Sequence, residues 1–344
     1  MIKVSVIGAN GYTGVELMNI FTRHPAVKTV SLVSQSNHGK AITELYPGLT
    51  AYDGIYYDKP DYEYIAANSD AVFTALPHAA SAEAVCVLLN SGVKVIDLSA
   101  DFRYEDVSVY ESVYKVTHPA KHIKGVYGLP ELFRQNIVNA TLVANPGCYT
   151  TSAILPLYPL LKEKLINPDE IIINAASGVS GAGRKAEISY NYCEINENFK
   201  AYSVTNHRHT SEIEEKLGLA AGRKITLQFT PHLLPVQRGI LSTIYLKPQG
   251  KYSAEEFKRV YDAYYGKEEF IKVRHDNSLP SINSVKYSNM AHIGYTYDAR
   301  TDRVIVVSAL DNLIKGAAGQ AVQNMNIMFN LPENTGLKSA PYHI

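Results

Sequence analysis

The N-terminal part of the chain alternates short apolar runs with segments that have helical spacing. Apolar runs that predict buried strands cover residues 2–7, 27–33, 71–76, 93–98 and 141–144. Apolar residues recur with helical spacing at 15–21 and 79–89. Strands that alternate with helices are typical of a parallel sheet with helices on both faces. The pattern therefore predicts a doubly wound α/β domain over residues 1–147.

The pattern changes after residue 147. Strands are predicted at 171–176, 224–229, 240–246 and 304–309, with few crossover helices between them. Residues 253–264 predict a helix, because Ser253 is a good N-cap and Glu256 follows it by three positions. These features predict an α+β domain with a mixed sheet over residues 148–310.

The last periodic segment, residues 311–329, predicts one long helix. It is rich in small residues, which allow another backbone or a cofactor to approach closely: Gly316, Ala317, Ala318, Gly319 and Ala321. We expect residues 311–344 to form a C-terminal segment whose helix returns to pack on the first domain.

Composition narrows the class of protein. The chain has 344 residues, 46% hydrophobic and 19% charged, which fits a soluble protein of two domains. Its formal net charge of zero gives no reason to expect nucleic acid or an anionic membrane as partner. No apolar run reaches the ~18 residues that a membrane helix needs. Three cysteines with no paired spacing favour a reducing compartment, so we expect a cytoplasmic protein.

A glycine-rich turn follows the first predicted strand directly. Its glycines stand three residues apart in Gly8-Ala9-Asn10-Gly11-Tyr12-Thr13-Gly14, and a predicted helix comes next. A dinucleotide pyrophosphate needs such a backbone, which turns sharply and presents helix N–H groups. The alternative is an ordinary glycine-rich connection. We predict that the cofactor contacts in this turn are Gly8, Asn10, Gly11, Tyr12, Thr13 and Gly14.

The end of the second predicted strand bears on which dinucleotide binds. NAD-binding sites usually carry an acidic residue there, to hold the ribose hydroxyls. This chain instead has Ser34 and Ser36, with His38 and Lys40 close behind. Hydroxyl groups with nearby cationic side chains suit a 2′-phosphate, so the sequence favours NADP over NAD.

Cys148 lies where a strand gives way to a helix. The strand at 141–144 stops at Asn145-Pro146-Gly147, and helical spacing resumes after Cys148, although Pro156 and Pro159 suggest an irregular start. The first N–H groups of a helix and its dipole favour a thiolate, which makes a cysteine nucleophilic. The alternative for Cys148 is a small buried residue in a tight turn. Cys86 lies in an apolar, helix-like segment, and we expect it to be part of the core.

Two histidines, His207 and His209, precede a helix that Thr210 or Ser211 is expected to cap. Zinc binding is one alternative, but the chain has no second cluster of ligands at a suitable spacing. A structural histidine with satisfied hydrogen bonds is the other. A histidine beside a thiolate is better suited to acid–base catalysis. Thiolate, histidine and nicotinamide together interconvert an aldehyde with an activated acyl group through a thioester. If phosphate is the leaving group, Arg103 and Arg184 are the candidates to bind it.

Motifs in order along nearly the whole chain resemble the type 1 N-acetyl-gamma-glutamyl-phosphate reductases, which are relatives of aspartate-semialdehyde dehydrogenase. They are GANGYTG (8–14), DLSADFR (97–103), YGLPE (127–131), NPGCYTT (145–151), SGVSGAGR (177–184), HRHTSEIE (207–214), PHLLPVQRGI (231–240) and residues 315–326. The resemblance implies NADPH-dependent reduction of N-acetyl-gamma-glutamyl phosphate to N-acetyl-glutamate 5-semialdehyde with release of phosphate, in arginine biosynthesis. It also implies a Rossmann-like first domain and a homodimer or homotetramer.

The resemblance also implies roles for single residues. Cys148 would be the thioacyl nucleophile, His209 the acid and base, His207 an assistant, and Arg103 a ligand of the phosphate. Within the same motifs and beside them we expect further cofactor contacts at Pro77, Ser180, Gly181 and Asn312. Further substrate contacts are expected at Asn145, Arg184 and Lys315, and no metal is expected.

Three positions depart from the usual family pattern: Asn10, Thr150 and Ser211. None of them removes a chemical group that the thioester mechanism needs, but the acyl group on the substrate nitrogen stays open. One alternative is a reductase of another acyl phosphate, of the aspartate-semialdehyde dehydrogenase type. A second alternative is a non-catalytic protein that senses NADP, but such a protein would not need the cysteine, histidine and arginines together. A third alternative is a cysteine hydrolase with Cys148 and His209 as its catalytic pair, and the glycine turn at residues 8–14 argues against it.

Overall fold

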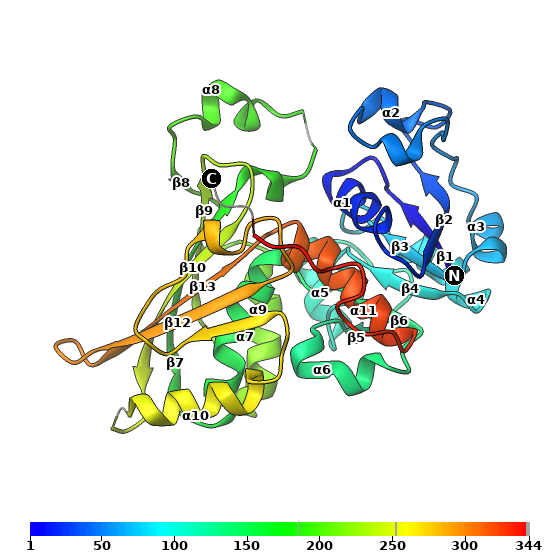
Figure 1. Ribbon diagram of the computed structural model, residues 1–344. Helices are drawn as coiled ribbons and strands as arrows, with labels where there is room; N and C mark the ends of the chain where they lie inside the picture. The colour runs from blue at the N-terminus through cyan, green and yellow to red at the C-terminus, as the bar shows by residue number, and fades with distance from the viewer. Residues whose placement is uncertain (185, 252, 342–344) are drawn as a thin grey trace. The chain divides into compact units, whose positions relative to one another are not determined.

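The computed structural model describes residues 1–184, 186–251 and 253–341. The chain divides into two compact units. The first unit consists of Met1–Pro146 and Ala317–Lys338, and the second consists of Gly147–Gly316 and the chain end from Ser339 onwards. In Figure 1 the first unit runs from blue to cyan-green and takes up the red helix near the C-terminus.

The first unit is built on a six-stranded sheet in which every neighbouring pair is parallel. In spatial order its strands are β2 (Val27–Val33), β1 (Ile2–Ile7), β3 (Ala71–Thr74), β4 (Lys94–Asp97), β6 (Leu142–Ala144) and β5 (Val126–Tyr127). The order reverses between β1 and β3. In an open α/β sheet, ligands bind at such a reversal, outside the carboxyl ends of the strands.

The helices of the first unit include one from the far end of the chain. They are α1 (Tyr12–Phe21), α2 (Ile42–Leu45), α3 (Tyr62–Asn68), α4 (Ala82–Asn90), α5 (Val107–Tyr114), α6 (Pro130–Ile137) and α11 (Gly319–Met328), with a 3₁₀ turn, η1, at Thr50–Tyr52. Helix α11 is buried along its whole length and packs on α1, α6 and β4. The Lys94 ammonium donates to the Met328 carbonyl at 2.6 Å. The predicted return of the C-terminal helix to the first domain is confirmed.

The second unit is built on a seven-stranded mixed sheet (Figure 1). In spatial order its strands are β11 (Ile271–Arg274), β12 (Ala291–Asp298), β13 (Arg303–Leu310), β10 (Ile240–Pro248), β7 (Ile166–Gly178), β9 (Gln228–Leu234) and β8 (Lys200–Ala201). The pairs β11–β12 and β7–β9 are parallel, and the remaining pairs are antiparallel. The predicted fold class, a parallel α/β domain followed by a mixed-sheet α+β domain, is confirmed.

Helices cover one face of the second sheet. The helices of this unit are α7 (Cys148–Lys162), α8 (Tyr192–Ile195), α9 (His209–Ala221) and α10 (Ala254–Tyr265), and the short turns are η2 (Val179–Ala182), η3 (Ile188–Tyr190), η4 (Ile282–Ser284) and the π-helical η5 (Ile314–Ala318). The Ser152 hydroxyl on α7 lies 2.8 Å from that of Ser242 on β10, which marks the covered face. The alternate β10 residues Leu241, Thr243 and Tyr245 are only partly buried.

Helix α7 runs without a break from Cys148 to Lys162, so the irregular start that Pro156 and Pro159 suggested is wrong. Pro156 and Pro159 lie inside it, although a proline has no N–H and frees the carbonyl four residues earlier. The Leu155 carbonyl, which Pro159 leaves without its helical donor, accepts the Tyr265 hydroxyl at 2.5 Å. Helix α10 thus supplies a hydrogen bond that α7 lacks, which the local sequence could not indicate.

Other local predictions are also wrong. The helix predicted at 79–89 begins only at Ala82. Helix α9 begins at His209 and neither Thr210 nor Ser211 caps it, because Arg208 occupies the N-cap position. A strand was expected at 224–229, but β9 starts at Gln228, so residues 224–227 are not part of it. The helix predicted at 311–329 is interrupted, because η5 precedes α11 and the boundary between the units falls after Gly316. Over the described part of the chain, no helix has the length and apolarity to cross a bilayer.

Candidate active site

The glycine turn lies at the reversal of strand order in the first unit. Gly8 has φ +90°, and a Cβ at this position would lie 2.4 Å from the Ala75 carbonyl oxygen, just after β3. A Cβ at Gly14 would lie 2.6 Å from the Gly8 carbonyl oxygen. Gly11 is the N-cap of α1 and offers no capping side chain to the first N–H groups of the helix. A tight glycine cradle beside an uncapped helix N-terminus fits a dinucleotide pyrophosphate.

The hydroxyl groups after β2 lie next to this turn. The Asn10 amide donates to Ser36 Oγ at 3.3 Å, and the Asn37 N–H donates to Ser34 Oγ at 3.1 Å. The Tyr46 hydroxyl donates to the Asn10 carbonyl at 2.8 Å. Tyr12 and Thr13 lie in the first turn of α1. The structure therefore brings the predicted contacts at residues 8–14, Ser34 and Ser36 into one cluster.

Cys148 is the first residue of α7, in the second unit. Gly147 is the N-cap, with φ −69° and ψ 154°, and its carbonyl accepts the Thr151 N–H at 2.9 Å. Cys148 is partly buried. A Cβ added at Gly316 would lie 2.8 Å from Cys148 Cβ, so η5 packs directly against the cysteine. The strand-to-helix position predicted for Cys148 is the one that the structure has.

His209 lies beside the residue that precedes the cysteine. A Cβ at Gly147 would lie 2.5 Å from His209 Nε2 and 2.9 Å from both Cδ2 and Cε1 of the same ring. The His207 and His209 rings are 5.0 Å apart between centroids, and the Tyr149 ring contacts both edge-on. Both predicted histidines therefore lie at the start of α7.

His207 is held as a neutral imidazole. Its Nδ1 accepts the His209 N–H at 3.2 Å, which leaves the ring proton on Nε2, 3.4 Å from the Tyr202 hydroxyl. Burial, with a smaller effect of the neighbouring Arg208, lowers the pKa of His207 to about 4. Burial also raises the pKa of Tyr202 to about 12. At neutral pH this pair is uncharged, so His207 is suited to orient a neighbour but not to donate a proton.

Glu212 is a site residue that the sequence analysis missed. Its side chain is fully buried on α9, and Oε1 accepts the Gly147 N–H at 3.1 Å and lies 3.0 Å from the Thr150 hydroxyl. This carboxylate ties the N-terminus of α7 to the helix that begins with His209. The sequence feature that could have revealed Glu212 is its spacing: it follows His209 by three residues and therefore lies on the same face of the helix.

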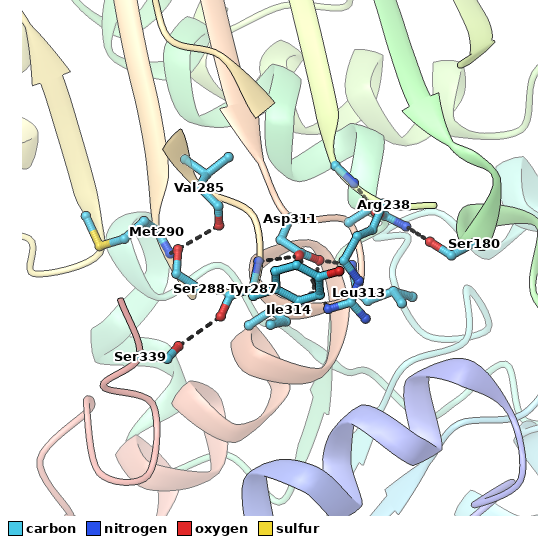
Figure 2. Close-up of polar contacts among 12 residues, drawn as sticks. Ser180, Arg238, Val285, Tyr287, Ser288, Met290, Asp311, Leu313, Ile314 and Ser339 are labelled. Atoms are coloured by element: carbon cyan, nitrogen blue, oxygen red, sulfur yellow. Dashed lines mark hydrogen bonds and ion pairs between the residues drawn. The ribbon is translucent and has the colours of Figure 1, made fainter. Parts of the chain in front are cut away.

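A second polar cluster surrounds Asp311, which is fully buried (Figure 2). Its carboxylate accepts the Tyr287 N–H at 2.7 Å and pairs with Arg238 Nη1 at 3.5 Å, while the Arg238 guanidinium lies 4.7 Å from the centre of the Tyr287 ring. The same carboxylate accepts the N–H groups of Leu313 and Ile314. Asp311 therefore fixes the turn that leads to η5.

The neighbouring Asn312 joins two predicted cofactor contacts. Its amide donates to Ser180 Oγ at 3.0 Å, and its carbonyl oxygen accepts the Gly239 N–H at 2.7 Å. A Cβ at Gly181 would lie 3.8 Å from Asn312 Nδ2. Ser180, Gly181 and Asn312 thus form one group in the second unit. Pro77 belongs to the first unit, in the connection that follows β3.

The four predicted substrate contacts lie in different parts of the chain. Arg103 is buried in the first unit, where Nη2 donates to the Leu98 carbonyl at 2.8 Å. Asn145 is also buried there, and its side chain bonds to the Ala317 carbonyl at 3.2 Å and to the Asn324 amide at 3.0 Å. In the second unit, Arg184 is exposed, and Lys315 is buried with Nζ 5.7 Å from the centre of the Phe270 ring.

Two family models match the chain, one in each unit. Residues 3–140 match "Semialdehyde dehydrogenase, NAD binding domain", and residues 148–312 match "Semialdehyde dehydrogenase, dimerisation domain". Among solved structures, aspartate semialdehyde dehydrogenase II from Vibrio cholerae is similar with a TM-score of 0.72 at 18% identity, covering 96% of this chain and 99% of that one. The enzyme from Candida albicans with NADP has a TM-score of 0.68 at 17% identity, covering 96% and 98%. At these identities the likeness concerns the fold.

Relatives with much higher identity extend along the whole chain. The N-acetyl-gamma-glutamyl-phosphate reductase of Pelotomaculum thermopropionicum is 52% identical over 338 residues, which cover 98% of this chain and 97% of that protein. The protein of the same name from Halothermothrix orenii is 49% identical over 341 residues, 98% of each chain.

Proposed function

The chain belongs to the N-acetyl-gamma-glutamyl-phosphate reductases, and from this premise we propose that it reduces N-acetyl-gamma-glutamyl phosphate to the 5-semialdehyde with NADPH, releasing phosphate, in arginine biosynthesis. The observation that carries the proposal is the start of α7. There a cysteine occupies the first helical position, and the His209 ring packs against the preceding glycine. A thiol and an imidazole in this arrangement suit covalent acyl transfer.

NADP(H) is the proposed cofactor, held by the glycine cradle of the first unit. The cradle at Gly8 and Gly14 leaves no room for side chains, and the first-turn N–H groups of α1 suit the pyrophosphate. The hydroxyls of Ser34 and Ser36 suit a 2′-phosphate, as does the absence of an acid among residues 34–38. When bound, the dinucleotide supplies the hydride that takes a thioester to the oxidation level of an aldehyde. Pro77, Ser180, Gly181 and Asn312 are proposed as further contacts.

Cys148 carries the acyl group in the proposed mechanism. Its thiolate attacks the γ-carbonyl carbon, the bond from that carbon to the phosphate oxygen breaks, and phosphate leaves with its electron pair. The product is a thioester on Sγ. After reduction at the carbonyl carbon, the C–S bond breaks, the aldehyde is released and the thiolate is regenerated. The position of Cys148 at a helix N-terminus supports the thiolate in both steps.

His209 is the proposed acid and base. Its Nε2 is the ring atom that faces Gly147, so it is the nitrogen nearer to the start of α7. It would accept the Cys148 proton before the attack. His207 is less suited to this role, because its lowered pKa keeps it neutral at working pH. We assign His207 to orienting His209, whose backbone N–H it accepts.

We propose that Arg103 and Arg184 bind the phosphate group of the substrate, since a guanidinium suits phosphate oxygens. Asn145 and Lys315 are the other two proposed substrate contacts. Like that of Arg103, their side chains are buried within one chain.

The second unit matches a dimerisation domain, and we propose a homodimer or a homotetramer formed through it. The face of its sheet opposite α7 carries Leu241, Thr243 and Tyr245, which are only partly buried within one chain. A sheet face that one chain leaves partly exposed suits a second copy of the chain.

A phosphate-dependent assay tests the function directly. In the reverse direction, the purified protein should reduce NADP⁺ when N-acetyl-glutamate 5-semialdehyde and phosphate are both present, and should do so far more slowly with aspartate semialdehyde. Cys148→Ser should abolish turnover and leave NADP⁺ binding within about twofold of wild type, because the hydroxyl is a much weaker nucleophile. Substantial turnover by the serine variant would rule out the covalent mechanism.

A further inference from the structure

Two buried carboxylates, Asp97 and Asp101, lie at the carboxyl end of the first sheet without a role in the mechanism above. Asp97 ends β4 and is fully buried, and Asp101 is 4% exposed in the loop that follows. Burial of a charge is costly unless hydrogen bonds compensate it. Two such groups within five residues therefore call for a physical reason.

Asp97 gathers three hydroxyl groups from neighbouring segments. Its carboxylate accepts Thr74 Oγ1 at 2.6 Å, Ser81 Oγ at 2.6 Å and Ser99 Oγ at 2.7 Å. Thr74 ends β3, and Ser81 is the N-cap of α4. The side chain of Ser81 is therefore used by Asp97 and does not cap its own helix.

Asp101 performs that capping from a distant loop. One carboxylate oxygen accepts the N–H groups of Ser81 and Ala82, at 3.1 and 3.2 Å, at the start of α4. The other accepts the Ala79 N–H at 2.8 Å and the Tyr110 hydroxyl at 3.0 Å. Ala79 has φ +65°, a left-handed conformation that costs a residue with a Cβ about 1 kcal/mol. Asp101 thus holds the connection between β3 and α4 in a conformation that it would not keep by itself.

The segment that Asp101 holds lies beside the glycine cradle. It begins at Ala75, whose carbonyl oxygen occupies the space where Gly8 would carry a Cβ, and it includes Pro77. The connection after β1 and the connection after β3 both leave the carboxyl ends of their strands, where the strand order reverses and where a dinucleotide is expected to bind. The loop that supplies Asp101 also supplies Arg103, which donates to the Leu98 carbonyl.

We propose that Asp101, supported by Asp97, is a positioning residue for the cofactor: through the N–H groups of Ala79, Ser81 and Ala82 it fixes residues 75–81 as the wall of the dinucleotide site. This inference rests on the proposed function, because it takes the glycine cradle to bind NADP(H). An amide in place of the carboxylate presents an NH₂ group to some of these N–H donors, so the segment should lose its conformation.

The test measures NADP⁺ binding by calorimetry on the purified full chain. Asp101→Asn should raise the Kd for NADP⁺ about tenfold, because it weakens charge-assisted hydrogen bonds. The rate at which iodoacetamide alkylates Cys148 should stay unchanged, since the cysteine belongs to the second unit. Tyr110→Phe is the matched control. It removes one donor to Asp101 but none of the three backbone contacts, so it should lower the free energy of unfolding and leave the Kd within about twofold.

An Asp101→Asn variant that is less stable but binds NADP⁺ like wild type would overturn the proposal and leave a merely structural role. If Asp101→Asn does not fold, Asp101→Glu asks the same question, because it keeps the buried charge but displaces the carboxylate from the Ala79 N–H. An unchanged Kd in that variant would equally overturn the proposal. Failure of wild type itself to bind NADP⁺ would instead contradict the proposed function.

Discussion

Gly147→Ala is the most direct perturbation of the arrangement at the start of α7. Gly147 has φ −69° and ψ 154°, a conformation that alanine adopts without strain, so the backbone has no reason to change. The added methyl carbon would lie 2.5 Å from His209 Nε2. Favourable contacts between non-bonded atoms begin near 3.5 Å, so the imidazole must retreat by about 1 Å. The substitution therefore displaces one side chain and leaves the cysteine in place.

The expected result is a loss of turnover without a loss of cofactor binding. A displacement of about 1 Å in a catalytic group can cost about 100-fold in rate, and the crowding should cost about 1–3 kcal/mol of stability. We expect kcat in the reverse assay to fall by about two orders of magnitude while the Kd for NADP⁺ stays within about twofold. The rate of Cys148 alkylation should fall at neutral pH, because the displaced His209 accepts the thiol proton less readily.

Gly48→Ala is the control, since a Cβ at this exposed position would meet no atom within 4 Å. It should leave kcat, binding and stability as they are. A Gly147→Ala variant that folds and keeps kcat within twofold of wild type would show that His209 is not the acid and base at this position. In that case the role assigned to the imidazole beside Gly147 would have to move to another group.

Arg103→Ala should raise KM for the acyl phosphate far more than KM for NADPH, and equal effects on the two would argue against a phosphate contact. His207 has a pKa of about 4 in the folded protein against 6.5 in the unfolded chain, so its contribution to stability is complete above pH 6.5 and is lost as the pH falls towards 4. His207→Gln should therefore reduce the loss in the free energy of unfolding, measured in urea, between pH 6.5 and 4, by at most about 3 kcal/mol before solvent screening. The same loss in the variant and in wild type would contradict a neutral His207 in the folded protein. Thr150→Val should cost about 1 kcal/mol of stability, because its hydroxyl lies 3.0 Å from the buried Glu212 carboxylate, and an unchanged urea midpoint would show that this contact contributes nothing.

Local sequence determined the elements that carry the proposed site residues. The glycine spacing at 8–14 follows a buried strand, and that order alone predicts a phosphate-binding turn because only glycine allows the backbone to approach so closely. The strand end at Asn145-Pro146-Gly147 predicted the position of Cys148 at the first turn of a helix. Alternation of apolar runs with helical spacing predicted the parallel sheet. Each of these sequence patterns involves residues that are close to one another in the sequence.

The tertiary structure decided what distant segments do for one another. Helix α7 continues through Pro159 because a tyrosine on α10 supplies the missing donor. Helix α4 starts three residues later than its apolar pattern suggests, because Ala79 has φ +65° and Asp101 accepts the N–H groups of Ala79, Ser81 and Ala82. The neutral state of His207 depends on burial, and Glu212 reaches Gly147 only because α9 packs on α7. Hydrogen bonds between residues far apart in the chain leave no periodic trace in the sequence, and only the fold brings the partners together.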